Sequence, residues 1–146
     1  REILGRRRLV QLSRIPIVAD ESAPSLGDAA REIQTGGATA LSIKTARTGF
    51  TESQKILGYA EALGIDVLMG NQIDSQLGSI ATVTFGAAFE YSSRRAAELS
   101  NFLDMADDLI ADPIRIEDGF VTAPTGPGVG TAIDEEKLAA YRIDRG

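Results

Sequence analysis

Short apolar segments that alternate with longer amphipathic segments are the feature that most constrains the fold of this chain. The apolar segments begin near residues 15, 40, 66 and 101. Each of the first three is followed by a polar loop and then by residues with helical spacing of their apolar positions. Such repeats build parallel sheets, because each helix carries the chain back to start the next strand in the same direction. The pattern therefore predicts an α/β fold with about four βα units.

The bounds of these elements follow from breaks in the pattern. We expect strands over residues 15–19, 40–43, 65–69 and 101–105. The first helix begins after Ser25, a good N-cap residue, and stops at Gly36. Further helices are expected over residues 51–63, 76–91 and 94–99, with Gly64 ending the first of these.

The pattern changes after the fourth unit. Residues 114–121 alternate like two strand edges around a turn, residues 124–130 form a loop rich in Pro and Gly, and residues 134–142 form a short capped helix. The loop is not a phosphate loop, because no Lys-Ser or Lys-Thr pair follows it. The chain therefore divides into residues 1–112, a partial barrel, and residues 113–146, a tail.

Two architectures can hold four such units. The strand spacing is near the roughly 31 residues per unit of a (β/α)8 barrel. A small open doubly wound sheet is the alternative, but the glycine-rich phosphate fingerprint common in that fold is absent. A barrel needs eight strands, so we expect the C-terminal half of a (β/α)8 barrel whose first half belongs to a longer chain.

Composition removes several kinds of chemistry. The 146 residues include no Cys and no His, which excludes thiol nucleophiles, imidazole bases and Cys/His zinc sites. The net charge of −6 argues against nucleic-acid binding. No apolar run reaches the length of a membrane span, and the arginine-rich start, with a basic cluster at residues 6–8, does not look like a secretory signal. We expect a cytoplasmic protein.

Polar side chains follow all four expected strands, and in a parallel barrel these ends meet at one face. They are Asp20, Glu21, Lys44, Asn71, Gln72 and Asp104. Lys44 directly follows apolar residues, so it should enter a site of low dielectric and could move protons there. Asp20 offers the oxygen ligand that Mg²⁺ or Mn²⁺ prefers, although one carboxylate is not a metal site. A structural salt bridge from Lys44 to Asp20 or Glu21 is the alternative interpretation.

Longer motifs strengthen the functional interpretation. Residues 17–22 read Ile-Val-Ala-Asp-Glu-Ser, residues 41–50 read Leu-Ser-Ile-Lys-Thr-Ala-Arg-Thr-Gly-Phe, and Asp112-Pro113-Ile114 and Asp118-Gly119 lead to Pro-Gly-Val-Gly at 127–130. Residues 69–74 and 99–105 belong to the same pattern. Together these motifs resemble the C-terminal part of enolase-superfamily enzymes of the muconate lactonizing group, over essentially the whole chain.

The resemblance implies roles for individual residues. Asp20 would be a metal ligand, with Glu21 beside it in the second shell, and Lys44 would act on the substrate. Asn71, Gln72 and Asp74 would bind substrate. The group carries a glutamate on its eighth strand, and we expect Asp104 to stand in for it.

The implied activity is the closure of cis,cis-muconate to muconolactone with Mg²⁺ or Mn²⁺, the lysine protonating an enolate. The resemblance further implies a small dicarboxylate substrate, a homo-oligomer, and ligands and an N-terminal capping domain that this chain lacks. Two alternatives stay open: an epimerase or racemase of a carboxylate substrate, and a half-barrel without activity of its own.

Overall fold

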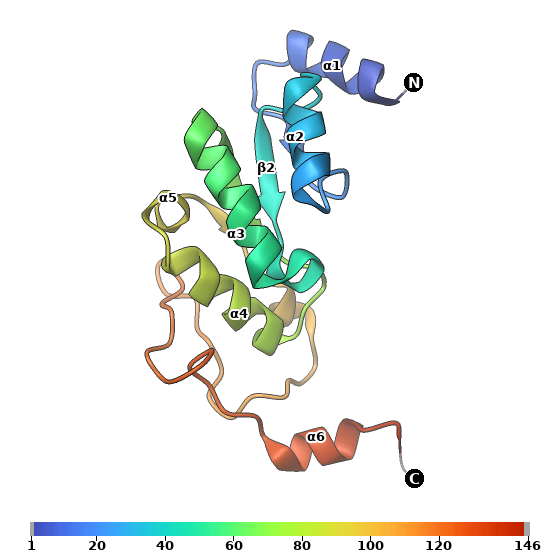
Figure 1. The fold of residues 1–146 in the computed structure, drawn as a ribbon. Helices are drawn as coiled ribbons and strands as arrows, with labels where there is room; N and C mark the ends of the chain where they lie inside the picture. Colours follow the sequence, from blue (N-terminus) through green and yellow to red (C-terminus); the bar gives the residue numbers. More distant parts are fainter. Residues whose placement is uncertain (1, 145–146) are drawn as a thin grey trace.

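Four strands form one parallel sheet in the order β1-β2-β3-β4, with helices running between them (Figure 1). The computed structural model describes residues 2–144, so Arg1 and residues 145–146 lie outside it. The strands are β1 (Val18–Ala19), β2 (Ala40–Ile43), β3 (Asp66–Gly70) and β4 (Ala97–Glu98). The helices are α1 (Glu2–Leu12), α2 (Leu26–Gln34), α3 (Thr45–Leu63), α4 (Gln76–Ala87), α5 (Glu90–Ser93), the 3₁₀ helix η1 (Asn101–Asp104) and α6 (Glu135–Tyr141). The predicted parallel α/β fold is confirmed.

The two faces of the sheet have different roles. Residues paired in register share a face, and successive residues of a strand alternate between faces. Leu41 and Ile43 of β2 lie on the face that packs against α3 and α4, and both are fully buried. The core on that face also contains Ala19, Val67, Met69, Ile56, Leu57, Ala60 and Val83. The opposite face holds the intervening residues of each strand, and it is the one that would line the interior of a barrel.

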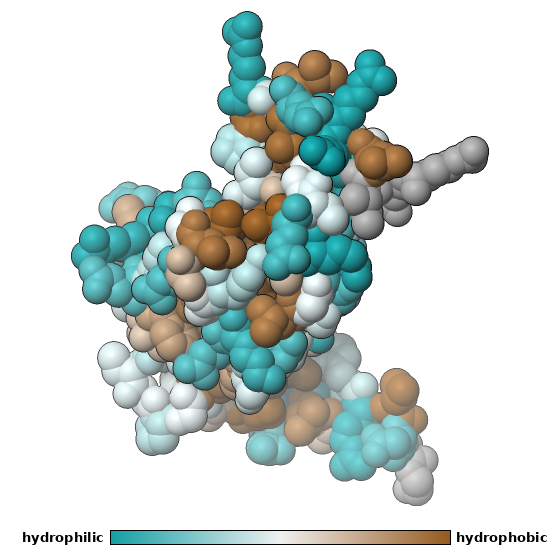
Figure 2. Space-filling model, turned by 45° about the horizontal axis from the view of Figure 1, so that its top comes forward, coloured by the Kyte–Doolittle hydropathy of each residue, from teal (hydrophilic) through white to brown (hydrophobic). Residues whose placement is uncertain are grey.

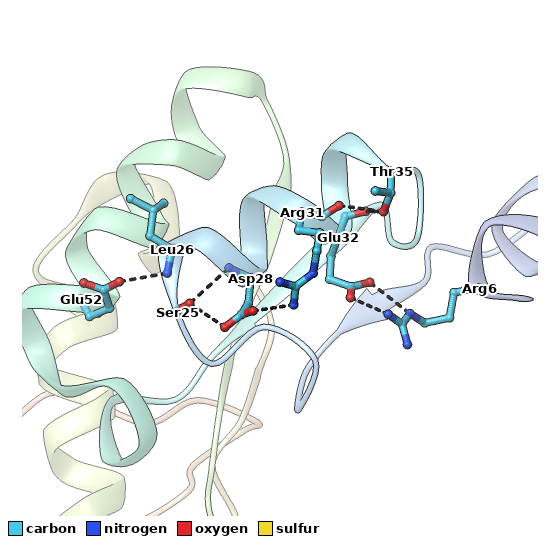
Figure 3. Close-up of polar contacts among 8 residues, drawn as sticks. All are labelled: Arg6, Ser25, Leu26, Asp28, Arg31, Glu32, Thr35 and Glu52. Carbon is cyan, nitrogen blue, oxygen red and sulfur yellow. Dashed lines mark hydrogen bonds and ion pairs between the residues drawn. The ribbon is translucent and has the colours of Figure 1, made fainter. Parts of the chain in front are cut away.

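Helix α2 is fixed at both ends, as Figure 3 shows. The Oγ of Ser25 accepts a hydrogen bond from the Asp28 N–H at 3.2 Å, which confirms the predicted N-cap. The Leu26 N–H donates to Glu52 Oε1 of α3 at 2.9 Å. Near the other end, Glu32 is 1% exposed and accepts two hydrogen bonds from Arg6 of α1. The basic cluster at residues 6–8 therefore contains an anchor that holds α1 to α2.

Helix α3 begins earlier than its apolar pattern indicates. The expected start was residue 51, whereas the helix runs from Thr45 with an interruption at Gly49, whose φ is 71° and ψ is 167°. A positive φ favours glycine, which has no Cβ to clash with the backbone. The turn from Thr45 to Thr48 is therefore a short separate piece between the end of β2 and the main helix.

The fourth unit differs from the prediction. Residues 101–105, expected as a strand, form η1, and residues 94–99, expected as a helix, contain β4. The apolar signal of residues 101–105 was misleading because Phe102 is buried from a 3₁₀ turn. β4 gave no such signal, since it is two exposed residues long. The expected helix over 76–91 is also divided, into α4 and α5.

The tail matches its predicted features. Glu117 and Phe120 form an antiparallel bridge across a turn at Asp118 and Gly119, which have φ of 50° and 81°. Positive φ at both central residues is typical of a type I′ hairpin turn. Helix α6 starts after Asp134, whose carboxylate accepts hydrogen bonds from two backbone N–H groups. The division at residue 112 stays a prediction. In the described part of the chain, every helix is too short or too polar to cross a bilayer.

Candidate active site at the end of the parallel strands

Lys44 directly follows β2 and is 6% exposed. Its Nζ lies 2.8 Å from Asp20 Oδ2 and 3.0 Å from Glu21 Oε1, both just after β1. β1 pairs with β2, so the parallel register brings these strand ends together. The structure thus joins three of the predicted site residues in one cluster.

The position of Lys44 depends on a glycine in the neighbouring strand. Continuing the register of β2 and β3 past Ile43 and Met69 places Lys44 beside Gly70, on the interior face. A Cβ on Gly70 would lie 2.9 Å from Ser42 Oγ and 3.2 Å from Lys44 Cε. The stem of the lysine therefore occupies space that any other residue at 70 would need.

Asp20 has a second cationic partner, which the sequence did not single out. Arg47 Nη1 lies 3.0 Å from Asp20 Oδ1, and its Nη2 donates to the Ser42 carbonyl at 3.0 Å. The Asp20 side chain is 32% exposed, and that of Arg47 is 13% exposed. Each oxygen of the Asp20 carboxylate is therefore paired with a different cation.

The charges in this cluster stabilise one another. Burial alone would lower the pKa of Lys44, but hydrogen bonds to Asp20 and Glu21 outweigh it and raise the pKa above its ordinary value. Partial burial alone would raise the pKa of Asp20, but hydrogen bonds from Lys44 and Arg47 outweigh it and lower the pKa. Lys44 is therefore an ammonium group at neutral pH and can donate a proton.

Asp20 and Glu21 have the oxygen donors that a divalent cation prefers, so the donor chemistry fits Mg²⁺ or Mn²⁺. The set is incomplete: residues 2–144 contain no group of three or more acidic side chains arranged to hold a metal ion. Asp20 fits as one ligand of a site whose other ligands would lie outside this chain.

The predicted substrate-binding residues lie mainly on the other face. Asn71 is 5% exposed and donates from Nδ2 to Ser79 Oγ of α4 at 2.9 Å and to Asp74 Oδ2 at 3.0 Å. Its side chain thus faces the helix layer, as does Met69 two residues earlier. Gln72 is exposed. The structure joins Asn71 with Asp74 and shows no contact of either with Lys44, so their substrate-binding role stays a prediction.

The strand-end acidic residue is different from the expected one. Asp104 lies exposed at the end of η1, and its role stays a prediction. β4 ends at Glu98, which pairs in register with Gly70. Glu98 therefore lies on the same face of the sheet as Lys44. The sequence pattern did not single out Glu98, because a strand of two exposed residues has no apolar pattern that marks its end.

A cavity of about 560 Å³ lies away from this cluster. It lies between α4, α5 and the hairpin at residues 116–121, and Met69 and Leu99 contribute to its lining. Because Met69 belongs to the helix-facing side of the sheet, this cavity is separated from Lys44 by the sheet itself.

Comparison with known proteins agrees with this geometry. The family described as enolase C-terminal domain-like matches residues 1–137. Muconate cycloisomerase 1 of Rhodococcus opacus is 30% identical over 91% of this chain and 36% of that protein. Chloromuconate cycloisomerase of Cupriavidus pinatubonensis is 32% identical over 92% of this chain and 36% of that protein. The chain thus spans about a third of the length of these relatives.

Solved structures show the same relation. The muconate lactonizing enzyme of Mycobacterium smegmatis is 56% identical, with a TM-score of 0.94 over 98% of this chain and 40% of that one. The muconate cycloisomerase of Pseudomonas fluorescens is 29% identical, with a TM-score of 0.89 over 97% of this chain and 39% of that one. The four parallel strands correspond to the C-terminal half of the enolase-superfamily barrel, and the chain belongs to the enolase C-terminal domain-like family.

Proposed function

We propose that this chain supplies the C-terminal half of the barrel, and the proton-donating lysine, of a cycloisomerase that converts cis,cis-muconate to muconolactone. The observation that carries the proposal is the buried ammonium of Lys44, held by Asp20 and Glu21 at the end of the parallel strands. The 56% identity to a muconate lactonizing enzyme supports this choice of substrate.

The reaction is an internal addition in which the muconate dianion gains one proton and becomes the lactone monoanion; Lys44 regains its proton from solvent. One carboxylate oxygen forms a bond to an alkene carbon, and the π electrons move onto the neighbouring carbon. That carbon, now electron-rich beside the other carboxylate, takes a proton from Lys44 Nζ. Lys44 acts as a general acid and is neutral after the transfer.

Asp20 would hold a divalent cation together with ligands from outside this chain. When bound, such an ion stabilises negative charge that develops on a substrate carboxylate. Asp20 and Glu21 keep Lys44 protonated and oriented, and Glu98 adds a carboxylate at the same face. The substrate of this proposal, cis,cis-muconate, is a small dicarboxylate.

Racemisation or epimerisation is the second candidate, and specific relatives favour it. N-succinylamino acid racemase of Amycolatopsis is 30% identical over 94% of this chain, and L-Ala-D/L-Glu epimerase of Francisella tularensis is 35% identical over 77%. In that chemistry Lys44 would exchange a proton on one face of the substrate carbon, and a second base outside this chain would act on the other face.

Replacing Lys44 in the full-length protein tests the proposal. Lys44→Ala should lower turnover of cis,cis-muconate by roughly 10²–10⁴-fold and leave KM nearly unchanged, because general acid catalysis acts in the transition state. Lys55→Ala removes a lysine from the exposed surface of α3 and should leave both constants unchanged.

The products separate the outcomes. In D₂O the unmodified protein should place deuterium on the face of muconolactone that Lys44 approaches. Full turnover by Lys44→Ala would remove Lys44 from the reaction. Turnover of N-acylamino acids or dipeptides, but not of muconate, would favour the second candidate.

A further inference from the structure

The C-terminal tail holds the first residue of α4 at two points. The Gln76 N–H donates to Asp108 Oδ2 at 2.6 Å, and the Ile114 N–H donates to Gln76 Oε1 at 2.7 Å. Asp108 and Gln76 are each 9% exposed. The other oxygen of Asp108 accepts the Leu109 N–H at 2.7 Å, which fixes the carboxylate to its own backbone. Together, Asp108, Gln76 and Ile114 form a buried tail clamp on the start of α4.

The tail clamp adjoins the loop of residues 71–75, which joins β3 to α4. At the other end of this loop, Asn71 donates to Asp74 Oδ2 at 3.0 Å and to Ser79 Oγ at 2.9 Å, and it is 5% exposed. Buried hydrogen bonds therefore fix the loop at both ends.

The backbone between these two anchors is strained. Ile73 has a φ of 55°, in the left-handed region that β-branched residues rarely adopt. Its side chain is 89% exposed, so side-chain packing does not hold this conformation. A strained conformation persists only where the surrounding structure fixes it. The contacts of Asn71 and the tail clamp supply that restraint.

The loop begins beside the candidate active site. Gly70, the last residue of β3, adjoins Lys44 on the interior face. Asn71 then turns toward the helix layer, and Gln72 and Ile73 follow it with exposed side chains. These two side chains are what the loop offers at the end of the strands.

We propose that Asp108 is a positioning residue for substrate binding: by fixing the start of α4, it holds the 71–75 loop in the shape in which Gln72 and Ile73 contact the substrate. The inference rests on the proposed function, which places the substrate at the Lys44 end of the sheet. A loop already held in its binding shape needs no ordering when the substrate arrives. Asp108 therefore lowers KM and leaves kcat unchanged.

Steady-state kinetics of the full-length protein separate these two constants. Asp108→Ala should raise KM for cis,cis-muconate about tenfold if the released loop adopts its binding shape about one-tenth of the time. The kcat should stay within about twofold, because the loop is ordered again once the substrate is bound. Asp108→Asn keeps one acceptor oxygen for the Gln76 N–H, so its KM should be intermediate, and it serves if Asp108→Ala does not fold.

A matched control removes the same chemistry from another helix of the tail. The carboxylate of Asp134 accepts the N–H groups of Glu136 and Lys137 at the start of α6. Asp134→Ala should loosen α6 and leave KM unchanged.

Amide hydrogen exchange without substrate tests the clamp apart from turnover. The Ile114 amide donates to the Gln76 side chain and not to Asp108. If the clamp acts as a unit, this amide should exchange about tenfold faster in Asp108→Ala and at the unmodified rate in Asp134→Ala.

The outcomes separate the inference from the proposed function. An unchanged KM in both Asp108 variants, a fall in kcat at unchanged KM, or unchanged exchange at Ile114 would overturn the positioning role and leave that of Lys44 in place. If the unmodified protein does not turn over muconate, the proposed function fails, and the same comparison of KM with an N-acylamino acid or a dipeptide decides the role of Asp108. If it turns over none of these substrates, the inference fails as well.

Discussion

Removing the Arg6 side chain should release α1 from α2. Glu32 is 1% exposed, and Arg6 supplies its Nη2 at 2.5 Å from Oε1 and its Nε at 3.1 Å from Oε2. The contact is tight: a Cβ on Gly37 would lie 2.7 Å from the same Oε2. Arg6→Met would leave a buried carboxylate without its guanidinium partner.

The expected cost follows from this burial. Removing one partner of a fully buried ion pair costs about 3–5 kcal/mol. The Arg6 side chain is 23% exposed, so water can enter beside it, and we expect a cost of about 2–3 kcal/mol, below that range. Glu32→Gln should cost less, about 1 kcal/mol. The neutral amide keeps the shape of the side chain, and the charge left without a partner is that of Arg6, which water can reach.

Amide hydrogen exchange measures this cost locally. In Arg6→Met, amides of α1 should exchange about 100-fold faster, which corresponds to about 2.7 kcal/mol of opening free energy. Amides of α4 should not change. Arg8→Met, at an exposed position of the same helix, is the matched control. A change below about threefold, or a larger effect in Glu32→Gln than in Arg6→Met, would refute the reasoning.

Three further predictions concern the chain as it stands and its tail. First, the 146-residue chain alone should bind Mg²⁺ weakly, because Asp20 is the only ligand we assign; micromolar affinity by calorimetry would show that other carboxylates take part. Second, the chain should self-associate, because large apolar side chains such as Leu12 and Ile15 are 74% and 73% exposed and apolar patches lie between polar ones (Figure 2). A monomer in light scattering that also unfolds cooperatively would contradict this. Third, acid should loosen α6. Hydrogen bonds from Lys137, the Asp108 N–H and Tyr141 lower the pKa of Asp107. The contribution of Asp107 to stability is therefore complete above the ordinary pKa of 3.8 and is lost as pH falls through the lowered pKa. Protection of the α6 amides from hydrogen exchange below that pH would show that Asp107 does not hold the helix.

The sequence predicted those parts of the fold that have strong periodicity. Leu41 and Ile43 gave the apolar signal of β2, and both side chains are fully buried in the structure. Lys44 ends the apolar run at the residue where the strand ends. The end of the sheet could not be predicted in the same way. Ala97 and Glu98 are exposed and make only two register pairs, so the strand depends on β3 as a template rather than on its own residues.

The site shows a similar division. Proximity of Asp20 and Lys44 follows from parallel strands that pair side by side. The contact of Arg47 with Asp20 required the break at Gly49, which no apolar pattern reports. The direction of Asn71 required the register, because a strand-end residue can face either the barrel interior or the helices.

Because side chains alternate between faces along β2, this site is far more sensitive to the number of residues in β2 than to which apolar residues they are. Deleting one residue between Ala40 and Ile43 would turn Lys44 toward the helix layer and bring Ile43 to the interior, since every side chain beyond the deletion exchanges faces. The same deletion in the loop after Asp20 would cost only a local rearrangement. Insertions and deletions in related genes should therefore accumulate between the strands and stay out of the four-residue stretch before the lysine.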